Sequence, residues 1–122
     1  MPRYVILEHD YPERHWDLML ESGEVLRTWR LAEPPRSGCA VRAEASFDHR
    51  RLYLDYEGPV SGGRGQVTRW DDGAFNWLAD ESERVLLHLQ GERCRGTVEL
   101  RRHAPGEWSL SLSEDSCQDI TG

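Results

Sequence analysis

The sequence predicts an all-β fold, a small antiparallel β-barrel of about eight short strands with little helix. Apolar runs are short and alternate with polar residues, and 11 glycines and 6 prolines separate them. A chain of 122 residues supports one hydrophobic core rather than two. Closure of the sheet is expected because it removes exposed strand edges. We therefore assign residues 1–112 to a barrel domain and the polar residues 113–122 to a flexible C-terminal tail.

The N-terminal part of the chain contains four expected strands. They are residues 4–8, 15–21, 25–31 and 41–45. A turn at residues 22–24 joins the second strand to the third, and a loop with adjacent prolines, residues 33–38, ends the third. Alternation along the second strand places His15, Asp17 and Met19 on one face.

The C-terminal part contains further alternating segments. The expected strands are residues 51–56, 66–70, 84–89, 97–101 and 108–112. Hairpin turns are expected at residues 91–92 and 105–106, and the glycine-rich residues 62–65 are interpreted as a bulge or corner of the barrel. Residues 71–73 resemble a turn, and residues 74–83 are the one expected helical turn.

Composition limits the classes of function. The net charge of −7 and the pI near 5.2 argue against broad non-specific attraction to nucleic acid. All fifteen basic residues are arginines, which bind phosphate well, but a GC-rich genome would produce the same bias. Composition therefore neither requires nor excludes a phosphate-bearing partner.

Targeting signals and disulfides are not expected. No apolar stretch approaches the ~20 residues of a membrane span, and the N-terminus lacks the pattern of a signal peptide, so a cytoplasmic protein without membrane contact is predicted. Cys39, Cys94 and Cys117 are odd in number and form no Cys-x-x-Cys pair, which favours reduced thiols over disulfides or a zinc ribbon.

The first pattern that suggests chemistry is His15-x-Asp17. Residues i and i+2 of a strand project from the same face, so this imidazole and carboxylate converge. His9 ends the preceding strand and would lie beside them if the two strands form a hairpin. Two imidazoles and one carboxylate would leave coordination positions of a divalent metal open for water or substrate. The alternative is an exposed polar face with an unrelated histidine.

Residues 9–21 also carry a resemblance to a known family. They read His-Asp-Tyr-Pro-Glu-Arg-His-Trp-Asp-Leu-Met-Leu-Glu, which resembles the motif His-Asp-x-x-x-x-His-Tyr-Asp-Phe-x-Leu-Glu of the 3′-phosphoesterase domain of bacterial DNA ligase D. Four further blocks resemble that family in the same order: residues 25–29, 48–58, 67–73 and 89–96. The resemblance covers about residues 4–112 and is specific because five blocks are in register.

The resemblance implies a metal-dependent phosphoesterase that removes 3′-phosphates or 3′-ribonucleotides from DNA primer–template ends in end-joining repair. It implies manganese as the preferred cofactor, with zinc or another transition metal as the alternative. The implied partners are nucleic-acid 3′ ends and a DNA ligase or polymerase, and the chain is expected to be a monomer.

The resemblance also assigns residues. His9, His15 and Asp17 correspond to metal ligands, and His49 corresponds to the histidine that contacts the scissile phosphate; these four form the expected catalytic set. Four positions depart from the family pattern, where glutamine, arginine, lysine and glutamate are replaced by Leu7, Met19, Glu33 and Phe47. The arginines that could restore a phosphate site are Arg14, Arg42, Arg50 and Arg64, with Arg51 as a further candidate.

Two other functions remain open from the sequence. The departures at Met19, Glu33 and Phe47 favour a non-catalytic or weakened metal-binding repair module that binds nucleic-acid ends or partner proteins. His-x-Asp with a distant histidine is also the ligand set of non-haem iron oxygenases, in which His49 or His103 would supply the third ligand.

Overall fold

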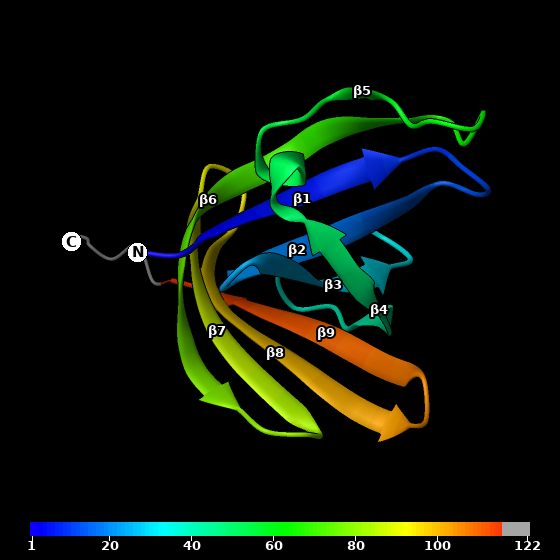
Figure 1. The fold of residues 1–122 in the computed structure, drawn as a ribbon. Helices are drawn as coiled ribbons and strands as arrows, with labels where there is room; N and C mark the ends of the chain where they lie inside the picture. The colour runs from blue at the N-terminus through cyan, green and yellow to red at the C-terminus, as the bar shows by residue number, and fades with distance from the viewer. Residues whose placement is uncertain (116–122) are drawn as a thin grey trace.

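The computed structural model describes residues 1–115, which form a closed antiparallel barrel (Figure 1). The elements are β1 (Arg3–His9), β2 (His15–Ser22), β3 (Val25–Leu31), β4 (Val41–Arg50), the 3₁₀ helix η1 (Arg51–Leu54), β5 (Gly58–Pro59), β6 (Gln66–Asp80), β7 (Arg84–Gly91), β8 (Arg95–Ala104) and β9 (Glu107–Glu114). Neighbours in the sheet follow the order β1-β2-β3-β4-β9-β8-β7-β6-β5. A further pairing of β1 with β6 closes eight strands and leaves β5 as an addition. The predicted fold class is confirmed.

Two hydrophobic clusters lie on opposite faces of β1 and β2. Alternation sends Tyr4 and Ile6 into the main core inside the barrel, with the inward side chains of β7, β8 and β9. The intervening Val5 and Leu7 belong to a second cluster, with Met19, Leu26, Leu54 and Val67. The segment containing η1 and β5 lies over β1 in Figure 1 and covers this second cluster. The barrel wall is therefore apolar on both faces there.

The C-terminal half of β6 is where the sequence prediction is wrong. The predicted turn at residues 71–73 and most of the predicted helical turn at residues 74–83 belong instead to one strand of 15 residues that ends at Asp80, and residues 81–83 form the connection to β7. Asp71 looks like a turn residue, but its buried carboxylate accepts hydrogen bonds from the β7–β8 turn and so stays in the sheet. A Cβ at Gly73 would collide with the backbone of Gln90, so this glycine serves close strand approach rather than a turn.

Residues 51–56 were also predicted wrongly as a strand. Residues 51–54 form the 3₁₀ helix η1, and β4 continues to Arg50 instead of ending at residue 45. Leu54 is buried in the second cluster. The compact turn of η1 places Leu54 over this cluster, because the chain there advances less per residue than an extended strand does. His49 consequently lies on β4 and not in a loop.

The last strand extends into the segment that was predicted as a tail, residues 113–122. Ser113 and Glu114 belong to β9, and residues 116–122 lie outside the described residues, so the flexibility of the tail stays a prediction. Within residues 1–115, no helix has the length and apolar character that a membrane crossing requires.

The two described cysteines differ in environment and should differ in reactivity. Cys94 is 1% exposed, and burial together with the charge of Asp71 raises the pKa of its thiol to about 12, whereas Cys39 is exposed. Because the thiolate is the nucleophile, we expect iodoacetamide at neutral pH to alkylate Cys39 and to leave Cys94 unmodified until the chain is denatured. Peptide mapping by mass spectrometry measures this. Equal rates at both thiols in the native protein would contradict the buried position of Cys94.

Candidate active site

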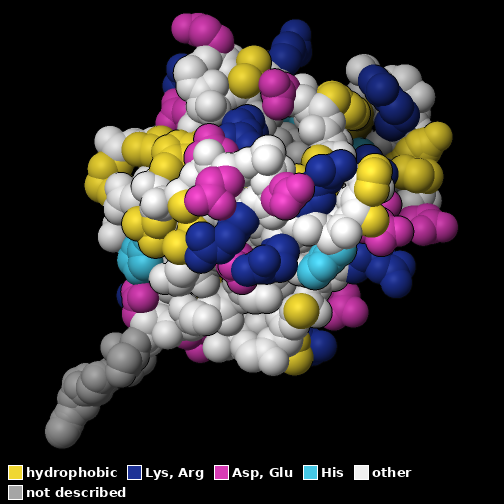
Figure 2. All heavy atoms as spheres, turned by 90° about the horizontal axis from the view of Figure 1, so that it is seen from below, with side chains coloured by type: hydrophobic (Ala, Val, Ile, Leu, Met, Phe, Trp, Pro, Cys, Tyr) yellow, Lys and Arg dark blue, Asp and Glu magenta, His cyan; other side chains and the backbone are white. Residues whose placement is uncertain are grey.

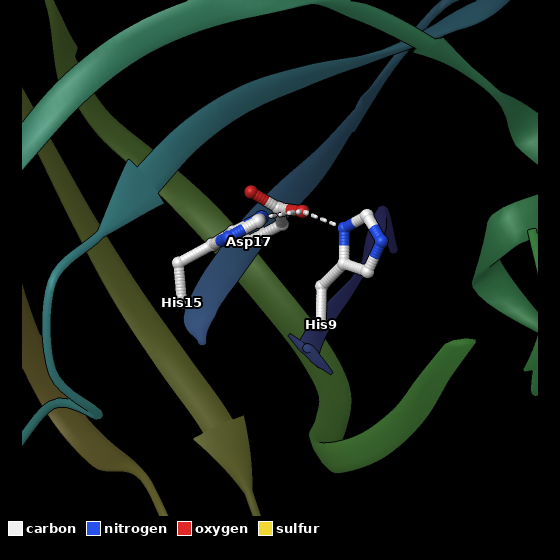
Figure 3. Close-up of side chains that lie close together, drawn as sticks. All are labelled: His9, His15 and Asp17. Carbon is white, nitrogen blue, oxygen red and sulfur yellow. Dashed lines mark hydrogen bonds and ion pairs between the residues drawn. The ribbon is translucent and has the colours of Figure 1, made fainter. Parts of the chain in front are cut away.

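The β1–β2 hairpin brings the three predicted metal ligands together (Figure 3). His9 and His15 are direct cross-strand partners, and Asp17 lies two residues farther along the same face of β2. One ligand atom from each residue lies within 4.8 Å of the other two. His15 and Asp17 are buried, at 5% and 4% exposure, while His9 is partly exposed. Among the described residues, this is the one group of three such side chains close enough to share an ion.

Backbone carbonyls fix which nitrogen of each imidazole carries a hydrogen. His9 Nε2 donates to the carbonyl of Arg64 at 2.8 Å, and His15 Nδ1 donates to the carbonyl of Glu13 at 2.8 Å. The remaining nitrogens, His9 Nδ1 and His15 Nε2, lie 4.0 Å and 3.2 Å from Asp17 Oδ2. Metal-binding histidines are held in this way, by an acceptor on the nitrogen that does not coordinate.

The donor set fits a divalent metal ion. Two imidazole lone pairs and a carboxylate oxygen face one point, and without a cation between them they repel one another. Imidazole and carboxylate together suit manganese, iron and zinc more than calcium or magnesium. Three protein ligands would leave further coordination positions for water or substrate. His9, His15 and Asp17 are therefore the residues that could hold a catalytic ion.

His49 lies in the same groove and has a defined tautomer. Its Nδ1 lies 3.0 Å from the Phe47 carbonyl and 2.9 Å from Thr28 Oγ1, whose hydroxyl donates to the Leu26 carbonyl. Nδ1 is therefore the hydrogen-bearing nitrogen, and Nε2 is left to interact with a ligand. Burial lowers the pKa of His49, so the ring is neutral at pH 7 in the free protein.

The groove has a volume of about 490 Å³, which is within the usual range for a small-molecule site. His9, Asp17 and His49 all line it. The other lining residues are Tyr11, Pro12, Met19, Arg30, Phe47, Asp48, Arg50, Tyr53, Val60, Arg64 and Val67. His15 lines a neighbouring cavity of about 350 Å³ instead. The three proposed metal ligands therefore lie between the groove and this cavity.

The chain matches the DNA ligase D 3′-phosphoesterase domain over residues 7–102, which include the hairpin ligands and His49. It belongs to this family. It is 31% identical to a multifunctional non-homologous end joining protein LigD of Pseudomonas aeruginosa, over 93% of the chain. It is 28% identical, over 86% of its length, to the corresponding DNA repair protein LigD of Mycobacterium tuberculosis. The chain spans 15% of the length of each of these relatives.

Within this phosphoesterase domain, the candidate phosphate-binding arginines fall into two groups. Arg50 and Arg64 line the groove that holds His49. Arg14 and Arg42 line the neighbouring cavity, and Arg14 pairs with Glu8 at 2.8 Å. Arg51 lines neither cavity and pairs with Glu21.

The departures from the family pattern have different structural explanations. Leu7 and Met19 are buried in the second hydrophobic cluster beneath η1, where an unpaired polar side chain would be costly. Glu33 is exposed and pairs with Arg36 at 3.5 Å, and it lines neither cavity. Phe47 lines the groove with an exposed ring. Leu7 and Met19 therefore belong to the apolar packing beside the groove, which Met19 also lines.

Sequence reasoning missed Arg30. It lies on β3 directly opposite Asp17, with its Nε 4.0 Å from Asp17 Oδ1, and it lines both cavities. Its Nε is buried without a hydrogen-bond partner among the described residues. The sequence could have predicted this position, because the tight turn between Ser22 and Val25 fixes the hairpin register that pairs Asp17 with Arg30. Arg30 brings a guanidinium to the groove that contains Met19.

The other histidine considered as a metal ligand lies elsewhere. His103 Nε2 forms a hydrogen bond with Ser109 Oγ at 2.8 Å near the β8–β9 turn. Among residues 1–115, His9 joins the His15–Asp17 pair within ligand distance, and neither His49 nor His103 does. Neither His49 nor His103 therefore takes the place of third ligand that the oxygenase interpretation gave it.

His15 and His49 should become protonated in a fixed order in metal-free protein. Burial opposes protonation of His15, but the hydrogen bond to Asp17 and its charge outweigh burial and raise the pKa of His15. Burial lowers the pKa of His49. As the pH falls, we therefore expect His15 to become protonated first, as followed by NMR of the imidazole nitrogens with EDTA present. Protonation of His49 before His15 would contradict the described environments.

Proposed function

We propose that this chain is a metal-dependent phosphoesterase that removes a 3′-phosphate or 3′-ribonucleotide from DNA ends in end-joining repair. The observation that carries the proposal is the convergence of His9 Nδ1 and His15 Nε2 on Asp17, beside a groove that His9, Asp17 and His49 line. Membership of the DNA ligase D phosphoesterase domain family supports the substrate class.

Each residue has a role in this proposal. A divalent ion, when bound, polarises a phosphate oxygen and lowers the pKa of a coordinated water. His9, His15 and Asp17 would hold that ion, with Mn²⁺ as the preferred candidate. A phosphate dianion beside His49 Nε2 raises the pKa of the imidazole, so bound substrate would convert His49 into a hydrogen-bond donor. The protonated ring could then stabilise a non-bridging oxygen or protonate the leaving alkoxide.

The test is phosphate release from a DNA primer–template that carries a 3′-phosphate. We expect release to depend on Mn²⁺, to stop with EDTA, and to be lost in the His9→Ala variant. A second substrate with a single 3′-ribonucleotide tests the ribonuclease arm. Purified protein that releases neither product with Mn²⁺, Zn²⁺, Co²⁺ or Mg²⁺ would refute the proposal.

Arg30 is proposed to supply the positive charge that Met19 lacks. We expect Arg30→Gln to raise KM for the 3′-phosphorylated primer by about tenfold, as loss of one charge-assisted contact does. Mn²⁺ affinity should not weaken, because Arg30 repels a cation. Steady-state kinetics and calorimetric Mn²⁺ titration measure the two effects. Arg101→Gln is the matched control, since Arg101 is exposed on β8 and pairs with Glu99. Equal KM values for the two variants would exclude a role for Arg30 in binding the phosphate.

The second candidate function is a non-catalytic module that binds nucleic-acid ends or partner proteins. It is favoured by the burial of Leu7 and Met19, where the family pattern has polar groups. DNA binding without turnover, unaffected by His49→Ala, would identify it. A ligase or polymerase partner, a monomeric state and a cytoplasmic location remain predictions from the sequence.

A further inference from the structure

Phe47 presents an aromatic face at the active-site groove. Its side chain is 72% exposed, which is unusual for a ring of this size. The other ring face packs on the imidazole of His49, with centroids 4.6 Å apart and planes inclined by 17°. Both side chains project from the same face of β4, two residues apart. The stack therefore begins at the histidine of the site and ends in solvent.

A second exposed aromatic ring lines the same groove. Large exposed hydrophobic side chains in residues 1–115 number five: Met1, Tyr11, Phe47, Leu52 and Leu78. Tyr11 and Phe47 both line the groove, from the β1–β2 loop and from β4. Tyr53 also lines it and packs edge-on against His49 at 5.7 Å. The groove is thus lined by the proposed metal ligands His9 and Asp17 and also by three aromatic side chains, Tyr11, Phe47 and Tyr53.

The negative charge of the chain disfavours non-specific ionic binding to nucleic acid. The net charge is −7, and arginine and acidic side chains are interspersed on the face that Figure 2 shows. Three arginines and two aspartates line the groove itself. Non-specific binding to the phosphate backbone depends on many basic contacts, so this surface offers little of it. Stacking of bases on aromatic side chains is the other common source of affinity for single-stranded ends.

We propose that Phe47 is a stacking platform for the nucleobase of the 3′-terminal nucleotide. The ring continues the stack that begins at His49, so a base on its free face leaves the attached 3′-phosphate within the same groove. This inference rests on the proposed function for the identity of the ligand. It adds that the protein contacts the base of the terminal nucleotide as well as its phosphate, and that an end without this base binds more weakly.

The experiment uses a single-stranded DNA oligonucleotide with a 3′-phosphate and 2-aminopurine as its terminal base. EDTA prevents turnover, so binding is read separately from catalysis. We expect fluorescence of 2-aminopurine to be quenched when the full chain binds, and removal of the terminal base to weaken binding about tenfold. Phe47→Leu keeps an apolar cover on His49 but lacks a π-face, and it should lose the quenching and about tenfold in affinity. Phe47→Trp should retain both.

Leu78→Ala is the matched control, because Leu78 is also exposed but lies on β6 outside the groove. Quenching that persists in Phe47→Leu, equal affinity for the abasic and intact oligonucleotides, or no binding by the unmodified chain would each overturn the platform. Failure of the proposed function looks different: the oligonucleotide binds with quenching but releases no phosphate when metal is added. Phosphate release without quenching would keep the function and refute the platform.

Discussion

Replacing Asp17 by asparagine should abolish both metal binding and phosphate release. Asp17 Oδ2 is the atom on which His9 and His15 converge, and asparagine has nearly the same shape without the charge. Loss of a carboxylate ligand is expected to cost more than the 10–100-fold that removal of a supporting hydrogen bond costs, so Mn²⁺ affinity should fall by at least about 100-fold. Isothermal titration of the purified variant with Mn²⁺ measures the affinity, and the 3′-phosphorylated primer–template measures the activity.

Asp72→Asn is the control for this experiment, because it removes one negative charge from β6 at a position that does not line the groove. It should bind Mn²⁺ like the unmodified chain. Circular dichroism should show the same strand content for both variants. A folded Asp17→Asn variant with unchanged Mn²⁺ affinity would exclude the hairpin as the metal site.

The second large effect concerns stability and not the site. Asp71 is buried and its carboxylate accepts four hydrogen bonds, from the Tyr4 hydroxyl at 2.7 Å and from the backbone amides of Glu92, Arg93 and Cys94 at 3.0 to 3.1 Å. In Asp71→Asn one acceptor oxygen is replaced by an amide NH2 group, which is a donor and faces other donors. We expect the free energy of unfolding to fall by about 3 kcal/mol, as measured by urea denaturation.

A graded pair of variants separates this network from general disruption. Tyr4→Phe removes one of the four hydrogen bonds and should cost about 1 kcal/mol, while Asp72→Asn should change stability by less than about 0.5 kcal/mol. Equal stability of Asp71→Asn and the unmodified chain would contradict the described network. The same carboxylate contributes to raising the pKa of the Tyr4 hydroxyl, after burial, so Tyr4 should stay protonated under native conditions.

The sequence was sufficient where contacts are local. The β1–β2 and β2–β3 hairpins follow from alternation and short turns, and they place His9, His15 and Asp17 together without information from the rest of the chain. The same register could have predicted Arg30 opposite Asp17.

Long-range contacts explain what could not be predicted. The backbone partners of Asp71 lie 21 to 23 residues away along the chain and Tyr4 lies 67 residues away, so nothing nearby distinguishes this strand residue from a turn residue. Leu54 turns inward because it fills a cluster built from β1, β2, β3 and β6. Thr28, the side-chain partner of His49 Nδ1, lies on the neighbouring strand 21 residues away. The residue types suggested the chemistry, but the barrel determines these positions.

The proposed metal ligands and the other residues of the groove come from different strands, which affects how substitutions can change the substrate. The three proposed metal ligands lie within one segment of nine residues, 9–17, whereas Arg30 comes from β3 and Phe47 and His49 come from β4. Replacements on β3 and β4 can therefore alter the substrate-facing side of the groove while the proposed ligands stay in place. We expect that the β1–β2 hairpin can be transferred to another barrel with the same strand register, and that the strands of the recipient barrel then determine which substrate binds.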